Sequence, residues 1–418
     1  MIDLFIVADD FTGALDTGVR YASRGVRTKV ITNPDVDLTQ VRDASVLVMD
    51  AETRHLQPLQ AYETVYDMVD RASRAGARYY YKKTDSALRG NIGAELTAVR
   101  DALGCRAVPF LPAFPEMGRK TAGGIHYVDG VPVSQSVFGR DPFEPVTESE
   151  VPRLIAQQCS TPVQVLTADV KASALREMEG ILLFDAETDE DLRSAGKQLQ
   201  EADMLNVAAG CAGFGAVEQE LLGLVGNTDR EMPKVPKGLT VICGSVNPIT
   251  QRQLDLAEEN GFARLRLSSA QKLTPGWAET PEGQQVIERW RQKIRDNPYC
   301  IIDANDADGN QKTAAWAAEH GLSVEDMRVR ISSVLGAVLA QLFREEGLGL
   351  LLITGGDTLL QCMHQMDVNE MEPLCEVFPG VVLSRFEKNG KDHLLISKSG
   401  GFGEEELLLK LKDMIERQ

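Results

Sequence analysis

Short apolar runs alternate with helical patterns through the first half of the chain. The runs that predict strands lie at residues 3–8, 28–32, 44–52, 78–83, 106–113, 163–167, 180–186 and 204–210. Helical patterns separate the first of them, at residues 12–25, 61–76 and 92–103. Strands that alternate with helices of this length are typical of a parallel sheet with helices on both faces. In such sheets ligands bind beyond the carboxyl ends of the strands.

The alternation restarts after residues 227–238, a polar stretch with two prolines that is typical of a linker. Strands then follow at residues 239–245, 262–268, 299–305, 348–358, 380–386 and 393–403, with helical patterns between them and at the end of the chain. We therefore predict an α/β fold with two domains, residues 1–232 and 233–418. Each domain should hold a largely parallel sheet flanked by helices, with an active site in the cleft between the domains.

Residues 124–150 interrupt this rhythm. The segment YVDGVPV has an Asp-Gly pair between two short β-type runs, which predicts a hairpin. The Pro-rich polar stretch after it is too long for an ordinary loop, so we expect a lid or a brace. A brace of this kind would suit a homodimer.

The composition narrows the class of protein. Across 418 residues, 43% are hydrophobic and 25% are charged, as in globular proteins. The net charge of −18 argues against a nucleic-acid partner, which needs clustered Lys and Arg. No stretch approaches the roughly 20 apolar residues that span a bilayer. Seven scattered cysteines without a CxxC pair, and an N-terminus without signal-peptide features, predict a cytoplasmic protein.

Polar clusters follow several predicted strands of the first half: ADDFTG, DAETRH, KKTDSALRGN and PAFPEMGRKT. In the first, Asp10 or Thr12 caps the following helix in one interpretation. In the other, Asp9 or Asp10 accepts hydrogen bonds from substrate hydroxyls or acts as a general base. Arg54, in the second cluster, is either a surface charge or the residue that holds a substrate carboxylate through two parallel hydrogen bonds.

The third cluster is the densest in charge and lies where a strand turns into a helix. Lys82 and Lys83 alternate faces if the strand continues, so one faces the ligand while the other pairs with an acid. Asp85 and Ser86 are expected to cap the helix, and Arg89 and Asn91 to border an anion site at its N-terminus. So many donors at one strand end suit a small, anionic, polyhydroxylated ligand.

Glycines follow three predicted strands of the second half, in ICGSVNP, ITGGDTLL and ISKSGGFG. Glycine at a strand-to-helix turn lets backbone N–H groups approach phosphate oxygens, and Ser or Thr hydroxyls add donors. Neither the Walker A motif nor GxGxxG is present. The five histidines show no metal-ligand spacing. A polyol-and-carboxylate site in one domain and a phosphate site in the other indicate phosphoryl transfer, which needs water excluded from the reacting phosphate.

The motifs ADDFTGALDTG, KKTDSALRGNIGAEL, PAFPEMGRKT, ITGGDT and KSGGFG together resemble the four-carbon acid sugar kinase family, in matching order over essentially the whole chain. The resemblance implies an N-terminal sugar-acid domain and a C-terminal nucleotide domain. It also implies that ATP phosphorylates the terminal hydroxyl of threonate, erythronate or 3-oxo-tetronate. The segment KKTDSALRG is more similar to the threonate and erythronate kinases, and we favour D-threonate.

The resemblance also implies site residues. Substrate contacts fall on Asp9, Asp10, Arg54, Lys82, Lys83, Asp85 and Arg89, and nucleotide contacts fall on Ser245, Gly355, Gly356, Asp357, Thr358 and Gly400. The family often has Asn where this chain has Gly401, and often Glu where it has Asp357.

The expected mechanism assigns catalytic roles to Asp85, Asp10 and Lys83. An aspartate among Asp9, Asp10 and Asp85 orients the hydroxyl and accepts its proton. Mg²⁺ and the glycine loops neutralise the transferring phosphoryl group. Two other classes remain open, a sugar-acid sensor without transfer activity and a nicotinamide-dependent dehydrogenase.

Overall fold

The computed structural model describes residues 2–41, 43–141, 144–227, 232–307, 309–344 and 347–418. The chain divides into two compact units, residues 1–230 and 231–418. The predicted linker at residues 227–238 includes residues 228–231, which lie outside the described residues. The predicted domain boundaries, 1–232 and 233–418, stay a proposal.

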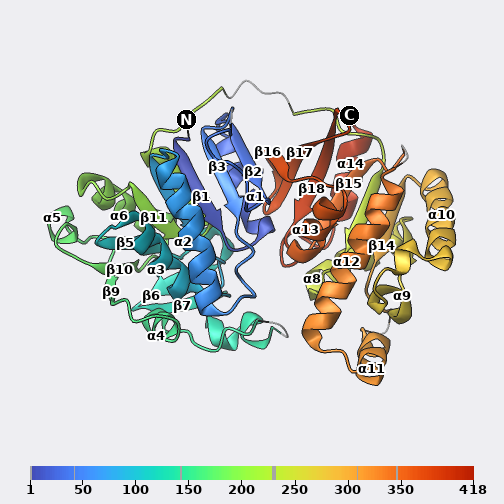
Figure 1. Cartoon of the computed structure of the whole chain (residues 1–418), viewed down its shortest axis with the longest axis horizontal. Helices are drawn as coiled ribbons and strands as arrows, with labels where there is room; N and C mark the ends of the chain where they lie inside the picture. Colours follow the sequence, from blue (N-terminus) through green and yellow to red (C-terminus); the bar gives the residue numbers. More distant parts are fainter. Residues whose placement is uncertain (1, 42, 142–143, 228–231, 308, 345–346) are drawn as a thin grey trace. The chain divides into compact units, whose positions relative to one another are not determined.

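The first unit is built on a parallel sheet with the strand order β2-β3-β1-β4-β11-β5-β10-β9 (Figure 1). The strands are β1 (Leu4–Ala8), β2 (Thr28–Ile31), β3 (Val46–Asp50), β4 (Tyr79–Lys83), β5 (Ala107–Leu111), β9 (Val163–Leu166), β10 (Gly180–Phe184) and β11 (Val207–Gly210). The central strands β1 and β3 are buried along their whole length, because helices cover both faces of the sheet.

The helices of the first unit cover the two faces in separate groups. They are α1 (Phe11–Ala22), α2 (Pro58–Arg74), α3 (Ile92–Leu103), α4 (Val151–Ala156), α5 (Ala172–Leu175), α6 (Asp189–Glu201) and α7 (Ala212–Leu221). Helices α2 and α3 pack together on one face through a shared apolar core that includes Val65 and Leu96. Helix α7 packs against both α1 and α6. The loop after β1 therefore leads to a different face from the loops after β3 and β4.

The segment after β5 forms a small antiparallel sheet, β6 (Arg119–Ala122), β7 (Ile125–Val128) and β8 (Val131–Pro132). The predicted YVDGVPV hairpin is confirmed as β7 and β8. Its turn residues Asp129 and Gly130 have φ angles of 50° and 82°, the left-handed values that a type I′ turn requires. The 3₁₀ turns of this segment are η1 (Pro115–Met117), η2 (Val133–Gln135) and η3 (Phe138–Arg140).

The second unit has the strand order β13-β14-β12-β15-β18-β17-β16. Its strands are β12 (Leu239–Cys243), β13 (Ala263–Arg266), β14 (Tyr299–Asp303), β15 (Leu350–Thr354), β16 (Glu370–Phe378), β17 (Val381–Lys388) and β18 (Lys391–Lys398). The pairs from β13 to β18 are parallel, whereas β16, β17 and β18 form an antiparallel meander. The sheet is therefore largely parallel, as the sequence predicts.

Helices also flank the second sheet (Figure 1). They are α8 (Pro248–Glu259), α9 (Ser269–Leu273), α10 (Pro281–Asp296), α11 (Gln311–Glu319), α12 (Val324–Leu342), α13 (Gly356–Gln365) and α14 (Leu407–Glu416), with the 3₁₀ turn η4 (Trp277–Glu279). Helices α8 and α14 share one apolar core with the sheet, and α12 packs against α13.

The predicted α/β class is confirmed, and the structure adds elements that the sequence pattern did not reveal. These are the meander strand β16, the hairpin between β6 and β7, and the helices α4, α5, α6, α7, α9, α11 and α13. Among the helices that the structure describes, none combines the length and apolar character that a membrane crossing needs. All seven cysteines are free thiols.

Candidate active site

The loops that follow β1, β3 and β4 begin side by side. Ala8, at the end of β1, is in register with Asp50 of β3 and with Lys83 of β4. The loop after β1 leads to α1, and the loops after β3 and β4 lead to α2 and α3 on the other face of the sheet. Adjacent strands whose loops diverge in this way leave a crevice at the carboxyl edge. Three of the predicted polar clusters therefore meet at one place.

Arg54 lies at the centre of this group. Its Nε and Nη2 atoms are both 2.7 Å from Asp9 Oδ2. Nη2 is also 2.7 Å from Asp10 Oδ1, and Nη1 donates to Asp10 Oδ2 at 3.1 Å. Asp85 Oδ1 is 3.6 Å from Nη2. The guanidinium group therefore holds the two aspartates of the β1 loop beside the aspartate of the β4 loop.

Asp10 both caps α1 and takes part in this charged cluster. It is the N-cap residue, and its Oδ1 accepts a hydrogen bond of 3.1 Å from the Gly13 N–H group. Thr12 Oγ1 donates to its Oδ2 at 2.7 Å. Burial acts to raise the pKa of Asp10, but the charges of Arg54 and Lys83 outweigh it and lower the pKa. Asp10 is therefore ionised at neutral pH and is positioned by the helix N-terminus.

Lys82 and Lys83 point to different sides of the sheet, as the strand alternation predicts. Lys82 Nζ lies 2.9 Å from Glu95 Oε2 of α3, and neither side chain is exposed. This buried ion pair argues against the expected contact of Lys82 with substrate. A Cβ atom on Gly13 would lie 2.6 Å from Lys83 Nζ, which places that ammonium at the start of α1.

The surrounding carboxylates keep Lys83 charged. Burial acts to lower its pKa, but the charges of Asp9, Asp10 and Asp85 raise it above the ordinary value. Lys83 is therefore a cation inside a cluster of three carboxylates, next to the backbone of α1.

Asp85 forms a two-pronged ion pair with Arg89. Arg89 Nε and Nη2 lie 3.1 and 2.9 Å from the two carboxylate oxygens. The backbone N–H groups of Ala87 and Arg89 also donate to Asp85 Oδ2. Burial acts to raise the pKa of Asp85, but Arg89 and Arg54 hold it well below the usual range. A carboxylate so strongly stabilised is a poor proton acceptor, which weakens the case for Asp85 as the general base.

The expected cap of the helix after β4 was wrong. Helix α3 begins at Ile92, and its N-cap residue is Asn91 rather than Asp85 or Ser86. The Asn91 amide donates to Thr53 O at 2.8 Å and to Leu56 O at 2.9 Å. Its side chain is therefore used to hold the loop after β3, not to border an anion site.

Two further residues shape this edge of the sheet without having been predicted. His126 of β7 is buried, contacts Ser86 O through Nε2 at 2.9 Å, and has its pKa lowered by burial to about 4. It is neutral and ties the small antiparallel sheet to the β4 loop. Asp50 is also buried, and its pKa is raised well above the usual range by burial and by the carboxylates of Glu52 and Asp10. Asp50 is the first residue of the DAETRH cluster, but nothing in the sequence predicts its raised pKa, and no candidate role was assigned to His126.

In the second unit, the glycine-bearing strand ends also come together. A Cβ atom on Gly244 would lie 2.1 Å from Thr358 Oγ1, and one on Gly400 would lie 2.5 Å from Ser245 Oγ. Gly355 has a φ angle of 103°, and a Cβ there would lie 3.7 Å from the Ser245 backbone nitrogen. The turns after β12, β15 and β18 therefore gather around Ser245, and only glycine fits two of them without displacing a neighbour.

This arrangement fits a phosphate group. β12 and β15 are adjacent, and the helices after them, α8 and α13, lie on different faces of the sheet, which is the position where doubly wound sheets bind ligands. Gly355 is the N-cap residue of α13, so the free N–H groups at the start of that helix face the same turns. The structure brings together the predicted residues Ser245, Gly355, Gly356, Thr358 and Gly400.

Asp357, the remaining predicted nucleotide residue, forms an ion pair with Arg328 of α12. Arg328 Nη1 lies 2.7 Å from Asp357 Oδ1 in the first turn of α13. Arg328 also pairs with Glu325 at 2.6 Å. The sequence pattern did not point to Arg328, because the contact joins two helices.

Within the described residues, no group of three or more His, Cys, Asp or Glu side chains has the arrangement of a metal site. Mg²⁺ commonly binds through one or two carboxylates together with substrate phosphates. A magnesium ion that accompanies a nucleotide therefore does not require such a group. Asp357 is the carboxylate nearest in sequence to the turns after β12, β15 and β18.

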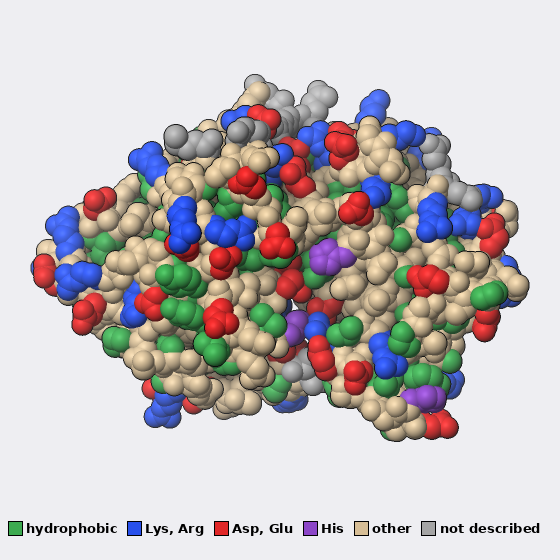
Figure 2. Space-filling model, viewed as in Figure 1, with side chains coloured by type: hydrophobic (Ala, Val, Ile, Leu, Met, Phe, Trp, Pro, Cys, Tyr) green, Lys and Arg blue, Asp and Glu red, His purple; other side chains and the backbone are tan. Residues whose placement is uncertain are grey.

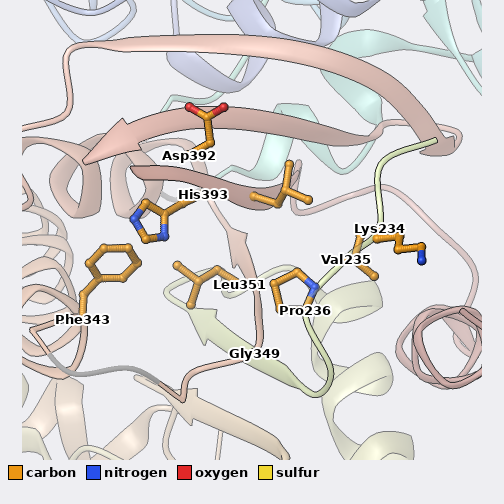
Figure 3. A pocket seen from close by; sticks show the side chains of 9 residues that line it. Lys234, Val235, Pro236, Phe343, Gly349, Leu351, Asp392 and His393 are labelled. Carbon is orange, nitrogen blue, oxygen red and sulfur yellow. The ribbon is translucent and has the colours of Figure 1, made fainter. Parts of the chain in front are cut away.

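A cavity of about 360 Å³ lies elsewhere in the second unit, at the amino ends of β12 and β15 (Figure 3). Pro236 and Gly349 line it just before these strands begin, and Phe343 and His393 contact each other edge to face with ring centroids 4.8 Å apart. It lies at the opposite end of these strands from the glycine turns.

On the face drawn in Figure 2, acidic and basic side chains are interspersed, without a broad basic patch among the described residues.

Comparisons with known proteins agree with this division of chemistry. Residues 4–220 match the model of the sugar-binding N-terminal domain, and residues 240–408 match that of the nucleotide-binding C-terminal domain. The D-threonate kinase of Salmonella typhimurium is 31% identical, over 97% of this chain and 96% of its own. The D-erythronate kinase of Heliobacterium modesticaldum is 26% identical, over 91% of this chain and 89% of its own.

Solved structures share the fold. A structure from Salmonella typhimurium LT2 has a TM-score of 0.78 at 21% identity, and covers 99% of this chain and all of its own. The Haemophilus influenzae protein HI1011 has a TM-score of 0.70 at 22% identity, over 98% of this chain and all of its own. The two domain matches together with the full-length relatives establish the family. This chain belongs to the four-carbon acid sugar kinase family, with a sugar-binding N-terminal domain and a nucleotide-binding C-terminal domain.

Proposed function

We propose that this protein is an ATP-dependent kinase that phosphorylates the terminal hydroxyl of a four-carbon sugar acid, D-threonate being the substrate we favour. The observation that carries the proposal is the cluster at the carboxyl ends of β1, β3 and β4, in which Arg54 holds Asp9, Asp10 and Asp85 together. The name of the Salmonella typhimurium relative supports D-threonate, and relatives named for D-erythronate and 3-oxo-tetronate remain alternatives.

In this proposal, cations near the cluster bind the substrate carboxylate. Lys83 is charged and lies at the N-terminus of α1, and Arg89 has 24% of its side chain exposed. Arg54 is 9% exposed and engaged with two aspartates, so its role is to orient those carboxylates. Lys82 stays in its buried pair with Glu95 and does not contact substrate.

The carboxylates bind and orient hydroxyl groups. Asp10 has 15% of its side chain exposed, against 2% for Asp9 and 10% for Asp85. We therefore assign Asp10 as the residue that accepts the hydrogen bond of the terminal hydroxyl and aligns its oxygen. Phosphoryl transfer has a loose transition state, so alignment matters more than a strong base. The low pKa of Asp10 is compatible with this positioning role.

The glycine turns of the second unit hold the nucleotide in this proposal. Backbone N–H groups of Ser245 and of the first turn of α13 donate to phosphate oxygens, with the Ser245 hydroxyl as a further donor. Mg²⁺ supplies charge neutralisation on the transferring phosphoryl group when it is bound. Asp357 is the side chain we assign to the ion, directly or through water. Transfer then requires that the phosphate turns and the hydroxyl held by Asp10 meet with water excluded.

The experiment that tests this function identifies the product. The protein is incubated with Mg-ATP and D-threonate, and phosphorus–proton coupling in the NMR spectrum locates the new phosphate ester. We expect coupling to the two protons of the terminal carbon. An ester at another carbon, or ATP hydrolysis without an ester, would contradict the proposal.

The homodimer and the cytoplasmic location stay predictions, and light scattering tests the first.

A further inference from the structure

Lys398, the last residue of β18, is a buried lysine that supports the turn after this strand, which contains Ser399 and Gly400. It is 1% exposed. Its ammonium donates to Thr250 Oγ1 at 2.9 Å, to Ser399 O at 3.0 Å and to Gly400 O at 3.3 Å. Thr250 of α8 donates in turn to Gly400 O at 2.6 Å. The ammonium and the threonine hydroxyl thus fix the backbone of the turn from behind.

This lysine has no carboxylate partner among the residues that the structure describes, unlike the two other lysines whose side chains are fully buried. Lys82 pairs with Glu95, and Lys272 pairs with Asp306 at 2.7 Å. A buried charge without a counter-ion is energetically costly, so proteins normally pair it.

The groups packed around Lys398 do not supply a negative charge either. Thr354 of β15 and Val381 of β17 are its register partners, and both are uncharged. The titratable group that acts on it is the thiol of Cys243 on β12. Burial and the nearby carboxylate of Asp303 raise the pKa of that thiol, so Cys243 is neutral at physiological pH.

We propose that Lys398 is a positioning residue, and that the phosphates of the bound nucleotide act as the counter-ion of its buried ammonium. It acts through the Ser399–Gly400 backbone, which it holds in place and polarises toward the ligand. The inference rests on the proposed function, because it requires that the turn around Gly400 faces a polyphosphate. It goes beyond that function by identifying the Lys398 ammonium as the charge that makes the protein bind a triphosphate more tightly than an uncharged nucleoside.

The protonation of Lys398 should therefore be coupled to nucleotide binding. Burial lowers the pKa of Lys398 to about 8 in the free protein. An anion near the turn stabilises the ammonium and raises that pKa. The protein must then take up protons when it binds ATP at a pH just above 8, where free Lys398 is partly neutral and ATP itself is fully ionised.

Calorimetry on the intact chain tests this. The binding enthalpies of ATP and of adenosine are measured at pH 8.5 in buffers with different enthalpies of ionisation, for the wild type and for Lys398→Met. We expect proton uptake with ATP but not with adenosine in the wild type, and no uptake in the variant. The variant should bind ATP at least about tenfold more weakly, with adenosine affinity nearly unchanged.

Lys272→Met is the matched control, because it removes a buried lysine that already has a carboxylate partner. It should leave the ratio of ATP affinity to adenosine affinity unchanged. If Lys398→Met lowers both affinities equally, or lowers neither, the inference is wrong and the proposed function stands. If the variant does not fold, proton uptake by the wild type on ATP binding still tests the inference. A wild type that binds ATP without taking up protons overturns it. A wild type that binds no ATP overturns the proposed function itself.

Discussion

The Lys82 ammonium lies 2.9 Å from Glu95 Oε2, and both side chains are completely buried between β4 and α3. The neighbouring residue on the same strand, Lys83, lies instead among the aspartates at the start of α1. Two consecutive lysines thus serve different purposes, one in the core and one in the charged cluster. Substituting each of them separates stability from catalysis.

Lys82→Met should destabilise the first unit. Removing one partner of a buried ion pair leaves the other charge unpaired, which costs about 3–5 kcal/mol. Unfolding in urea measures the loss, and the double variant Lys82→Met/Glu95→Leu should recover a large part of it. A Lys82→Met protein as stable as the wild type, but with a raised KM for the sugar acid, would instead restore Lys82 to the substrate site.

Lys83→Met should impair the reaction while changing stability much less. Loss of a cation that binds the substrate carboxylate removes a charged hydrogen bond of about 1.5–3 kcal/mol, so kcat/KM should fall by roughly 10- to 100-fold. Steady-state kinetics measured beside Lys82→Met provides the comparison, since the two substitutions are chemically identical. Near-normal kcat/KM in Lys83→Met, with Lys82→Met folded and inactive, would reverse the two assignments.

Gly244→Ala should weaken ATP binding. The new Cβ would lie 2.1 Å from the hydroxyl oxygen of the buried Thr358, so this side chain or the turn after β12 must shift. We expect a loss in ATP affinity of about tenfold or more, measured by calorimetry. Gly401→Ala is the control, since its Cβ would meet only the Asn247 side chain at 3.6 Å. Equal ATP affinities in the two variants would argue against a phosphate site at these turns.

Much of the fold follows from the sequence pattern because the sheets are parallel and buried. Continuous apolar runs and helical periodicity placed most strands and located the helix Ile92–Leu103 at the residues where the structure has it. The same reasoning identified the glycine turns and the charged strand ends, since ligands bind at the carboxyl edge of such sheets.

The rest depends on contacts between segments far apart in the chain. Strand alternation shows that Lys82 and Lys83 differ in direction, but only the position of Glu95 on α3 decides which one is buried. Asn91 rather than Asp85 caps α3 because Leu88 and Gly90, with φ angles of 64° and 87°, interrupt the backbone between Asp85 and the helix. Arg328 lies outside every motif, and Lys398 is the first residue of KSGGFG. Neither role can be predicted from the sequence, since the roles come from Asp357 and Thr250 on other elements.

The buried Glu218 of α7 predicts a pH dependence of stability in the first unit. Tyr21 donates to its Oε2 at 2.9 Å, and burial raises the pKa of Glu218 from 4.5 to about 8. The folded protein therefore keeps a proton that the unfolded chain releases above pH 4.5. The contribution of Glu218 to stability falls as pH rises from about 4.5 to 8, because deprotonation of this residue favours the unfolded chain.

Glu218→Gln keeps a polar partner for Tyr21 but cannot ionise. It should have nearly wild-type stability at pH 5 and should be more stable than the wild type at pH 9, by on the order of 3 kcal/mol. Urea unfolding at the two pH values measures the difference. A variant with the same pH profile as the wild type would show that Glu218 is not protonated in the folded state.

The most direct test of the proposed function measures ADP release from Mg-ATP with a panel of acids. The panel contains D- and L-threonate, D- and L-erythronate, their 3-oxo form and D-glycerate, and each assay is repeated with the Asp10→Asn variant. We predict strong turnover with one four-carbon acid, D-threonate first among them, and a loss of roughly 100-fold in kcat in the variant. An enzyme that binds ATP but releases no ADP with any four-carbon acid would contradict the proposed function.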